Sequence, residues 1–98
     1  MSILALLDLT LKPESVADAP AVIHETLTAT RAFDGCLGVE VLMDAHDQTH
    51  IVLLERWESA ESDAAYRAWR ATTAGASRLR SILATPPLLT TYDVAPDI

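Results

Sequence analysis

The chain is short of several residue types that mark particular functions. It has one cysteine, Cys36, so neither an intrachain disulfide nor a cysteine-based zinc site can form. Seven basic residues stand against 14 acidic ones, and the formal charge of -7 disfavours binding to nucleic acid or to an anionic membrane. No glycine-rich phosphate loop follows a predicted strand, so no motif indicates a nucleotide or a flavin. We therefore expect no cofactor, no nucleic acid partner and no membrane partner.

The 98 residues are enough for one domain with a single core, and half of them are hydrophobic. A domain of this size has a high surface-to-volume ratio, which favours burial against a partner. Its apolar start, residues 1–7, lacks a basic segment and a cleavage site, and Asp8 interrupts it well short of membrane-spanning length. These features predict a single-domain cytoplasmic protein over residues 1–98.

Two strand-like segments flank a polar connection in the middle of the chain. Residues 36–43 and 51–57 are rich in apolar and β-branched side chains, a pattern that predicts a β-hairpin with a long loop. Gly35 stands just before the first of these strands, where a residue that tolerates positive φ lets the chain turn.

The segments on either side of the hairpin complete a familiar order of elements. Residues 3–11 are almost continuously apolar and predict a strand buried on both faces. A helix should run from beyond Pro13 to about residue 31, with Pro20 in its first turn or at a kink. Ser59 should cap a helix over 60–72, followed by a short helix from about 77 and a last strand over 88–94. The order βαββαβ predicts an α+β, ferredoxin-like fold with a four-stranded antiparallel sheet.

The sheet itself predicts an assembly. Helices can cover only one face of a four-stranded sheet, and the other face would still carry large apolar side chains from the first strand and the hairpin. An apolar patch of that size on a protein surface predicts a partner, and the simplest partner is a second copy. We therefore predict a homodimer whose two sheets pack face to face into a barrel.

A family resemblance rests on the hairpin and its flanks. The segments F-D-G-C-L-G-V-E-V and H-I-V-L-L-E-R-W-E-S, the alanine-rich helix after them and P-P-L-L-T-T-Y resemble the antibiotic biosynthesis monooxygenase (ABM) domain family of dimeric α/β barrels, over about residues 4–94. The resemblance implies a small pocket between sheet and helices, open to flat aromatic ligands. In the cofactor-free members the substrate anion itself reduces dioxygen, so the protein binds a ring, removes a proton and stabilises the anion.

The haem-degrading branch of this family is not expected here. That branch relies on an asparagine in the first strand and on a histidine in the second helical region. This chain has no asparagine, and its three histidines, His24, His46 and His50, all precede residue 60. The lack of asparagine also distinguishes this chain from some quinone-forming members of the family. His46 and His50 bracket a polar turn, which favours a hydrophilic loop over a metal site, and no metal is predicted.

Two residues are the catalytic candidates. Asp8 is a carboxylate in the middle of an apolar strand, and burial would make it a plausible base for a phenolic proton. It could equally pair with an arginine such as Arg78 or lie at a wet edge. Tyr66 and Trp69 are three residues apart and share a helix face. They could hold a flat ring, with the Tyr66 hydroxyl as donor or proton relay, or they could be plain core.

The other candidates would bind substrate. Trp57 matches the tryptophan of the family at the end of the third strand, where it could form a pocket wall or core. His24 could point to the rim of the pocket or to solvent. Arg78, with its neighbouring arginines, could steer an anionic substrate or only balance nearby acidic residues.

Taken together, these features favour a homodimeric, cofactor-independent monooxygenase acting on a phenolic, anthrone-type or quinol aromatic. Asp8 and Tyr66 would be catalytic, and Trp57, Trp69, His24 and Arg78 would bind substrate. One alternative is a non-catalytic ligand-binding or structural dimer, because an aromatic content of 5% is low for a site that holds polycycles. Another is an isomerase or cyclase on the same scaffold.

Overall fold

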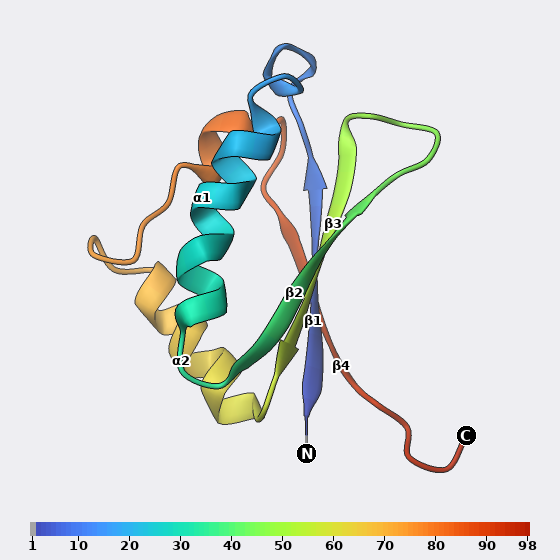
Figure 1. Ribbon diagram of the computed structural model, residues 1–98, viewed down its shortest axis with the longest axis vertical. Coiled ribbons are helices and arrows are strands. Elements are labelled where there is room, and N and C mark those ends of the chain that lie inside the picture. The colour runs from blue at the N-terminus through green and yellow to red at the C-terminus, as the bar shows by residue number, and fades with distance from the viewer. Residues whose placement is uncertain (1) are drawn as a thin grey trace.

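The computed structural model describes residues 2–98 as one antiparallel sheet with its helices on one side (Figure 1). Its elements in chain order are β1 (Ile3–Thr10), the 3-10 helix η1 (Pro13–Ser15), α1 (Ala19–Ala32), β2 (Cys36–Met43), β3 (His50–Trp57), α2 (Ala60–Arg70), the 3-10 helix η2 (Leu79–Ile82) and β4 (Leu88–Asp93). The strands lie in the order β2-β3-β1-β4, and all neighbours are antiparallel. The predicted ferredoxin-like fold is therefore confirmed.

The ends of the two α-helices follow from local chemistry. α1 begins at Ala19, so Pro20 lies in the first turn, where its missing N–H breaks no helical hydrogen bond. The region after Pro13 forms the separate η1, so the helix starts later than expected, and of the two placements predicted for Pro20 the first turn is confirmed. At α2 the Ser59 hydroxyl oxygen accepts a hydrogen bond from the Ser62 N–H at 3.1 Å, as predicted.

Gly35 sits where α1 gives way to β2. Its φ of 89° lies in the left-handed region that favours glycine. A Cβ atom at this position would lie 2.3 Å from the Ser62 hydroxyl oxygen. The prediction of a turn that requires glycine is confirmed, and the close approach of α2 adds a second reason for it.

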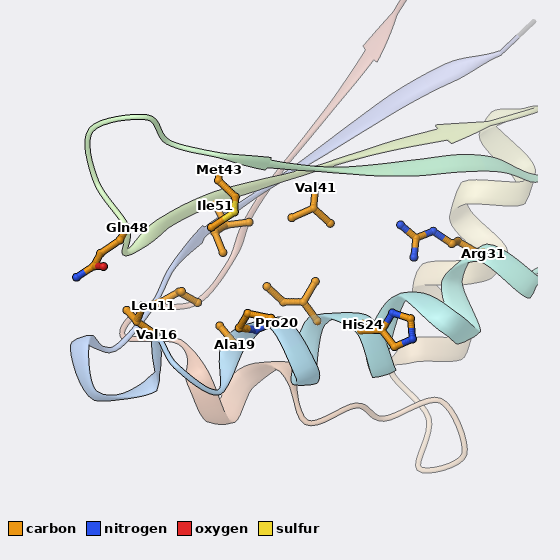
Figure 2. Close-up of a pocket in the computed structure, with 11 residues that line it drawn as sticks. Leu11, Val16, Ala19, Pro20, His24, Arg31, Val41, Met43, Gln48 and Ile51 are labelled. Carbon is orange, nitrogen blue, oxygen red and sulfur yellow. The ribbon is translucent and has the colours of Figure 1, made fainter.

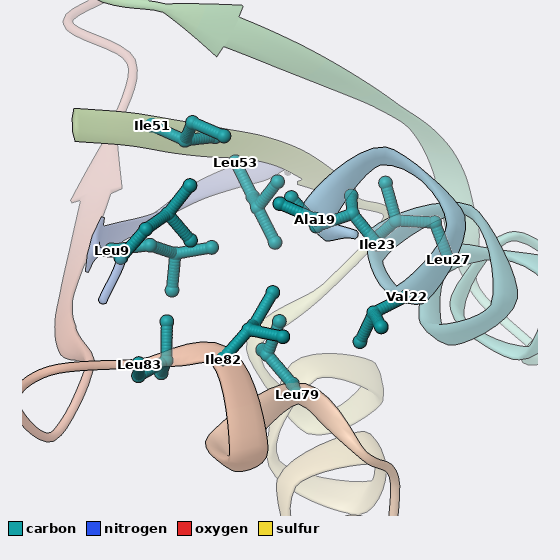
Figure 3. Close-up of a cluster of buried hydrophobic side chains, with 11 residues drawn as sticks. Leu9, Ala19, Val22, Ile23, Leu27, Ile51, Leu53, Leu79, Ile82 and Leu83 are labelled. Atoms are coloured by element: carbon teal, nitrogen blue, oxygen red, sulfur yellow. The ribbon is translucent and has the colours of Figure 1, made fainter. Parts of the chain in front are cut away.

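The core lies between the sheet and the helices in two clusters. The larger one packs aliphatic residues of β1, β3, α1 and η2, including Leu9, Leu27, Leu53 and Ile82 (Figure 3). The smaller one holds Ile3, Ala5, Trp57 and Tyr66, with Phe33, Cys36 and Trp69 packed against it. Both clusters draw alternate residues from β1 and β3, so the odd-numbered residues of these strands face the helices.

The even-numbered residues form the other face of the sheet, here called the open face. Leu4, Leu6 and Asp8 of β1 belong to it and are partly buried within the single chain, so burial of this strand on both faces would require a partner. Leu88 and Tyr92 pair with Asp8 and Leu4, so they share this face and are 66% and 48% exposed. Within residues 2–98 no element covers the open face, and no helix is long and apolar enough to cross a membrane.

Candidate functional site

The helix side of the sheet contains a cavity of about 400 Å³, here called the arginine-lined pocket. β1, α1, β3, α2 and the segment that leads to β4 all contribute to its wall. Its polar side chains are Thr26, Thr30, Glu55, Tyr66, Arg67, Arg70, Ser77 and Arg80. A pocket of this volume is at the lower end of the range that small ligands occupy.

Glu55 is the most unusual residue of the pocket, because it is a carboxylate with only 1% exposure. Its Oε1 accepts hydrogen bonds from Trp57 Nε1 at 3.1 Å and from Arg67 Nη2 at 2.5 Å. Neither bond uses Oε2, and Glu55 lines the pocket, so a bound ligand could donate a proton to this second oxygen.

Arg67 joins this carboxylate to a second one. The Arg67 Nε donates to Asp63 Oδ1 at 3.1 Å, one helical turn earlier in α2. Asp63 is itself almost buried. One guanidinium thus lies between two carboxylates at the wall of the pocket, an arrangement that keeps Glu55 paired while leaving its second oxygen unused.

Tyr66 is held in a separate network. Its hydroxyl lies 2.6 Å from Thr30 Oγ1 and accepts a hydrogen bond from Arg70 Nε at 2.7 Å. Because Thr30 donates its own proton to the Thr26 carbonyl oxygen, the proton between the two hydroxyls belongs to Tyr66. Arg70 also donates to the Gly75 carbonyl oxygen at 3.1 Å. The hydroxyl proton of Tyr66 is therefore already in a hydrogen bond to Thr30. The hydroxyl oxygen can accept a further hydrogen bond, but the group has no free proton to donate.

The aromatic side chains form a packed cluster. Trp57 is fully buried, and its ring centroid lies 4.9 Å from that of Tyr66. Phe33 packs against both members of the predicted ring-holding pair, at 5.3 Å from Tyr66 and 5.5 Å from Trp69. Trp57 consequently has no face free for a ligand and belongs to the core. Tyr66 belongs to the same core cluster and also lines the arginine-lined pocket, and the partly buried Trp69 packs against this cluster.

Asp8 does not lie in the pocket, which corrects the expectation of a buried base. It pairs across the sheet with Val52 on the open face, and its side chain is half exposed. The reason is strand alternation, which places residue 8 with Leu4 and Leu6 and away from the helices. Asp8 pairs with an imidazole, and the alternative partner Arg78 lies elsewhere.

His50 bridges two carboxylates on the open face. Its Nδ1 lies 2.8 Å from Asp44 Oδ2 and its Nε2 lies 3.1 Å from Asp8 Oδ1. These hydrogen bonds, Asp44 first and then Asp8, raise the pKa of His50 above its ordinary value. The same bond to His50 lowers the pKa of Asp44. Within residues 2–98 no group of three histidine, cysteine, aspartate or glutamate side chains could hold a metal ion.

His24 and Arg78 lie outside the arginine-lined pocket. His24 is exposed on α1 and lines a different cavity, between α1 and the β2–β3 hairpin (Figure 2). Arg78 is exposed and forms an ion pair with Glu25, which lowers the pKa of the Glu25 carboxyl. Of the six predicted site residues, only Tyr66 lines the arginine-lined pocket.

The sequence interpretation missed Glu55, although a signal for it exists. Ile51, Leu53 and Trp57 alternate along β3 and are all buried, and Glu55 falls in the same row. A carboxylate in an apolar row must find a buried partner, and such residues are candidates for a functional site.

Comparison with known proteins places this geometry in context. The profile of a family described as antibiotic biosynthesis monooxygenase matches residues 2–75. A search of curated proteins found none that matches. Among solved structures, Rv0793 from Mycobacterium tuberculosis has a TM-score of 0.79 at 19% identity, over 99% of this chain and 98% of that one.

Two further structures share the fold. A Deinococcus radiodurans protein, provisionally named an antibiotic biosynthesis monooxygenase, has a TM-score of 0.81 at 23% identity, over 98% of this chain and 95% of that one. SnoaB, a cofactor-independent oxygenase from Streptomyces nogalater solved in mutant form, has a TM-score of 0.80 at 13% identity, over 95% and 92%. At these identities the likeness concerns the fold alone.

Proposed function

Because this chain belongs to the antibiotic biosynthesis monooxygenase family, we propose that it is a cofactor-independent monooxygenase that oxidises a phenolic, anthrone-type or quinol aromatic with dioxygen. The arginine-lined pocket is the proposed site. The observation that carries the proposal is Glu55, a carboxylate in the pocket wall with one oxygen paired and the other unused. In place of Asp8, Glu55 is the proposed base.

The proposed reaction needs only a base, a cation and a ring site. Glu55 Oε2 takes a proton from the substrate, and the resulting anion gives electrons to dioxygen. Protonation of Glu55 weakens its hold on Arg67, so the guanidinium charge becomes available to the substrate anion as that anion forms. For an anthrone, a CH2 group becomes a carbonyl and the second oxygen atom leaves as water, so the substrate supplies all the electrons.

Tyr66 has a supporting part in this scheme. Its proton is bound to Thr30, so it cannot act as an acid without rearrangement. It holds Arg70 in the pocket wall through the Nε bond at 2.7 Å, and is therefore a positioning residue. The volume of about 400 Å³ favours substrates of one to three fused rings over larger polycycles.

Dioxygen uptake by the metal-stripped protein tests the proposal, over a panel of anthrones, naphthols and quinols against a no-protein blank. We expect uptake that scales with protein and falls about 10²–10⁴-fold in Glu55→Gln, the usual contribution of a general base. Glu58→Gln, a matched change at the exposed glutamate that directly follows β3, should retain the wild-type rate. Uptake that is absent across the panel, or unchanged in folded Glu55→Gln, would refute the proposal.

An isomerase is the second candidate, because a proton-accepting carboxylate beside a guanidinium also suits the transfer of a proton within one substrate. Glu55 and Arg67 would act as they do above, with no electron transfer. Turnover of an enolisable substrate that continues under nitrogen and depends on Glu55 would favour this reading over the monooxygenase.

We further propose a cytoplasmic homodimer in which a second copy covers the open face. The support is the exposure of Leu42, Leu88 and Tyr92 on that face, at 44%, 66% and 48%. A two-fold axis would let this apolar area pack on itself. In sedimentation velocity we expect a wild-type dimer and a monomer for Leu54→Asp, at the open face of a central strand, whereas Ile98→Asp at the exposed C-terminus stays dimeric. A monomeric wild type would contradict the proposal.

A further inference from the structure

A second cavity, of about 350 Å³, lies between α1 and the β2–β3 hairpin, here called the hairpin slot. Figure 2 shows Val41, Met43 and Ile51 on the strand side, with Ala19 and Pro20 on the helix side. The hairpin slot and the arginine-lined pocket share no lining residue. A ligand in one would therefore leave the other free.

The strand wall of the slot is apolar and unusually open. Val41 and Met43 pair across the sheet with the core residues Leu53 and Ile51, so they face the helix side. Even so they are 38% and 68% exposed, because the slot separates them from α1. Apolar side chains on the inner face of a sheet are normally covered, and covering them removes apolar surface from water.

One end of the slot carries a cation. Arg31, in the last turn of α1, reaches along the slot beneath β2, and His24 lies beside it on the helix (Figure 2). Arg31 Nη2 donates to the Val39 carbonyl oxygen at 3.1 Å, which fixes the guanidinium at this end and uses one of its N–H groups. Among residues 2–98 the arginines that form ion pairs with carboxylates are Arg56, Arg67 and Arg78, and Arg31 is not one of them.

The guanidinium of Arg31 is thus held in place without a carboxylate, in a chain of formal charge -7. A carboxylate is the group that a guanidinium fork binds best, through two parallel hydrogen bonds. The rest of the slot offers only apolar surface until Gln48 at its other end. The arrangement matches a ligand with an apolar body and one acidic group.

The volume sets the size of that ligand. At about 30 Å³ for each non-hydrogen atom, the share that a water molecule takes in the liquid, the slot holds roughly ten to twelve such atoms. We propose that the hairpin slot binds a small monocarboxylate of this size, with its apolar body against Val41, Met43 and Ile51 and its carboxylate on Arg31. This site is independent of the proposed oxygenation and of the arginine-lined pocket.

Octanoate, with ten non-hydrogen atoms, is a suitable probe, and 1-octanol is its uncharged counterpart. Titration of the labelled protein followed by ¹H–¹⁵N correlation spectra reports both the affinity and the place of binding. We expect saturable shifts at residues 19–24 and 41–51 and a weaker affinity for 1-octanol. Arg31→Gln should weaken octanoate binding about tenfold and leave 1-octanol binding unchanged, and Arg31→Lys should restore part of the loss.

Two tryptophan variants test the location. Val41→Trp fills the slot and should abolish binding of both probes, whereas Ala64→Trp, at an exposed position of α2 that lines neither cavity, should leave binding intact. Shifts that cluster on Glu55 and Tyr66, no saturable shift at all, or octanoate binding that is unchanged in Arg31→Gln would overturn the proposal. None of these outcomes bears on dioxygen uptake, so the two proposals can fail separately.

Discussion

The Glu55–Arg67 pair allows a quantitative test of the pocket. Arg67→Met removes the guanidinium while keeping much of the side-chain volume, and leaves Glu55 buried with only the Trp57 N–H as partner. Removing one partner of a buried ion pair costs about 3–5 kcal/mol. Because the Arg67 side chain is 26% exposed, water can reach the remaining carboxylate in part, and we expect a loss of about 3 kcal/mol.

The double variant separates this pair from general packing. If the loss in Arg67→Met arises from the unpaired carboxylate, then Glu55→Gln in the same chain removes the charge and should recover about 1–2 kcal/mol of it. Urea unfolding at one fixed protein concentration measures both values, since association would otherwise change the apparent stability. A loss below about 1 kcal/mol in Arg67→Met, or no recovery in the double variant, would refute the buried pairing.

Three further outcomes follow from the structure. Gly35→Ala should lower the free energy of unfolding by about 1–3 kcal/mol, because the alanine would have to adopt positive φ and its Cβ would clash. In the same urea titration Gly38→Ala should lower this free energy by less, because the added Cβ meets no atom within 4 Å. Ser59→Ala should cost about 1 kcal/mol through the lost cap, measured likewise, and a loss of only a few tenths would contradict the role of the cap. The pKa of His50 is raised from 6.5, so its stabilising pairing should be complete below pH 6.5 and lost as the pH rises through that raised pKa. His50→Gln should remove this part of the pH dependence of unfolding, and an unchanged dependence would contradict it.

Local patterns were enough to predict most elements of the fold. The strand at residues 36–43 matches β2, and Ser59 caps α2, because apolar alternation and capping depend on neighbours in the sequence. The same local reasoning could not divide the region between Pro13 and Pro20. Whether η1 and α1 join depends on where the chain must turn to bring α1 onto the sheet, and that is a tertiary constraint.

Asp8 and Glu55 lie on opposite faces of the sheet, and the sequence pattern alone does not assign both of them to the correct face. β1 is apolar on both faces, so its sequence cannot say which row meets the helices. β3 offers a better guide, since Trp57 is too large to leave uncovered and Glu55 lies in its row. The pairing of Glu55 with Arg67, twelve residues away on α2, then requires the packed structure. A charged residue is therefore best assigned to a face through the largest apolar residue of its own strand.

The two faces of the sheet carry different acid–base groups, Glu55 on the helix side and His50 on the open face, and a change of pH should affect them differently. On the helix side Glu55 is paired with a guanidinium, which stays charged at any pH a protein experiences. On the open face the central group is the His50 imidazole, whose charge is lost above its raised pKa. If a second copy covers the open face, a rise in pH should act on association through Asp44, His50 and Asp8, and leave the pairing of Glu55 intact. A pH-dependent change in dimerisation with constant turnover per chain would therefore point to the open face, whereas a change in turnover of a constant dimer would point to the pocket.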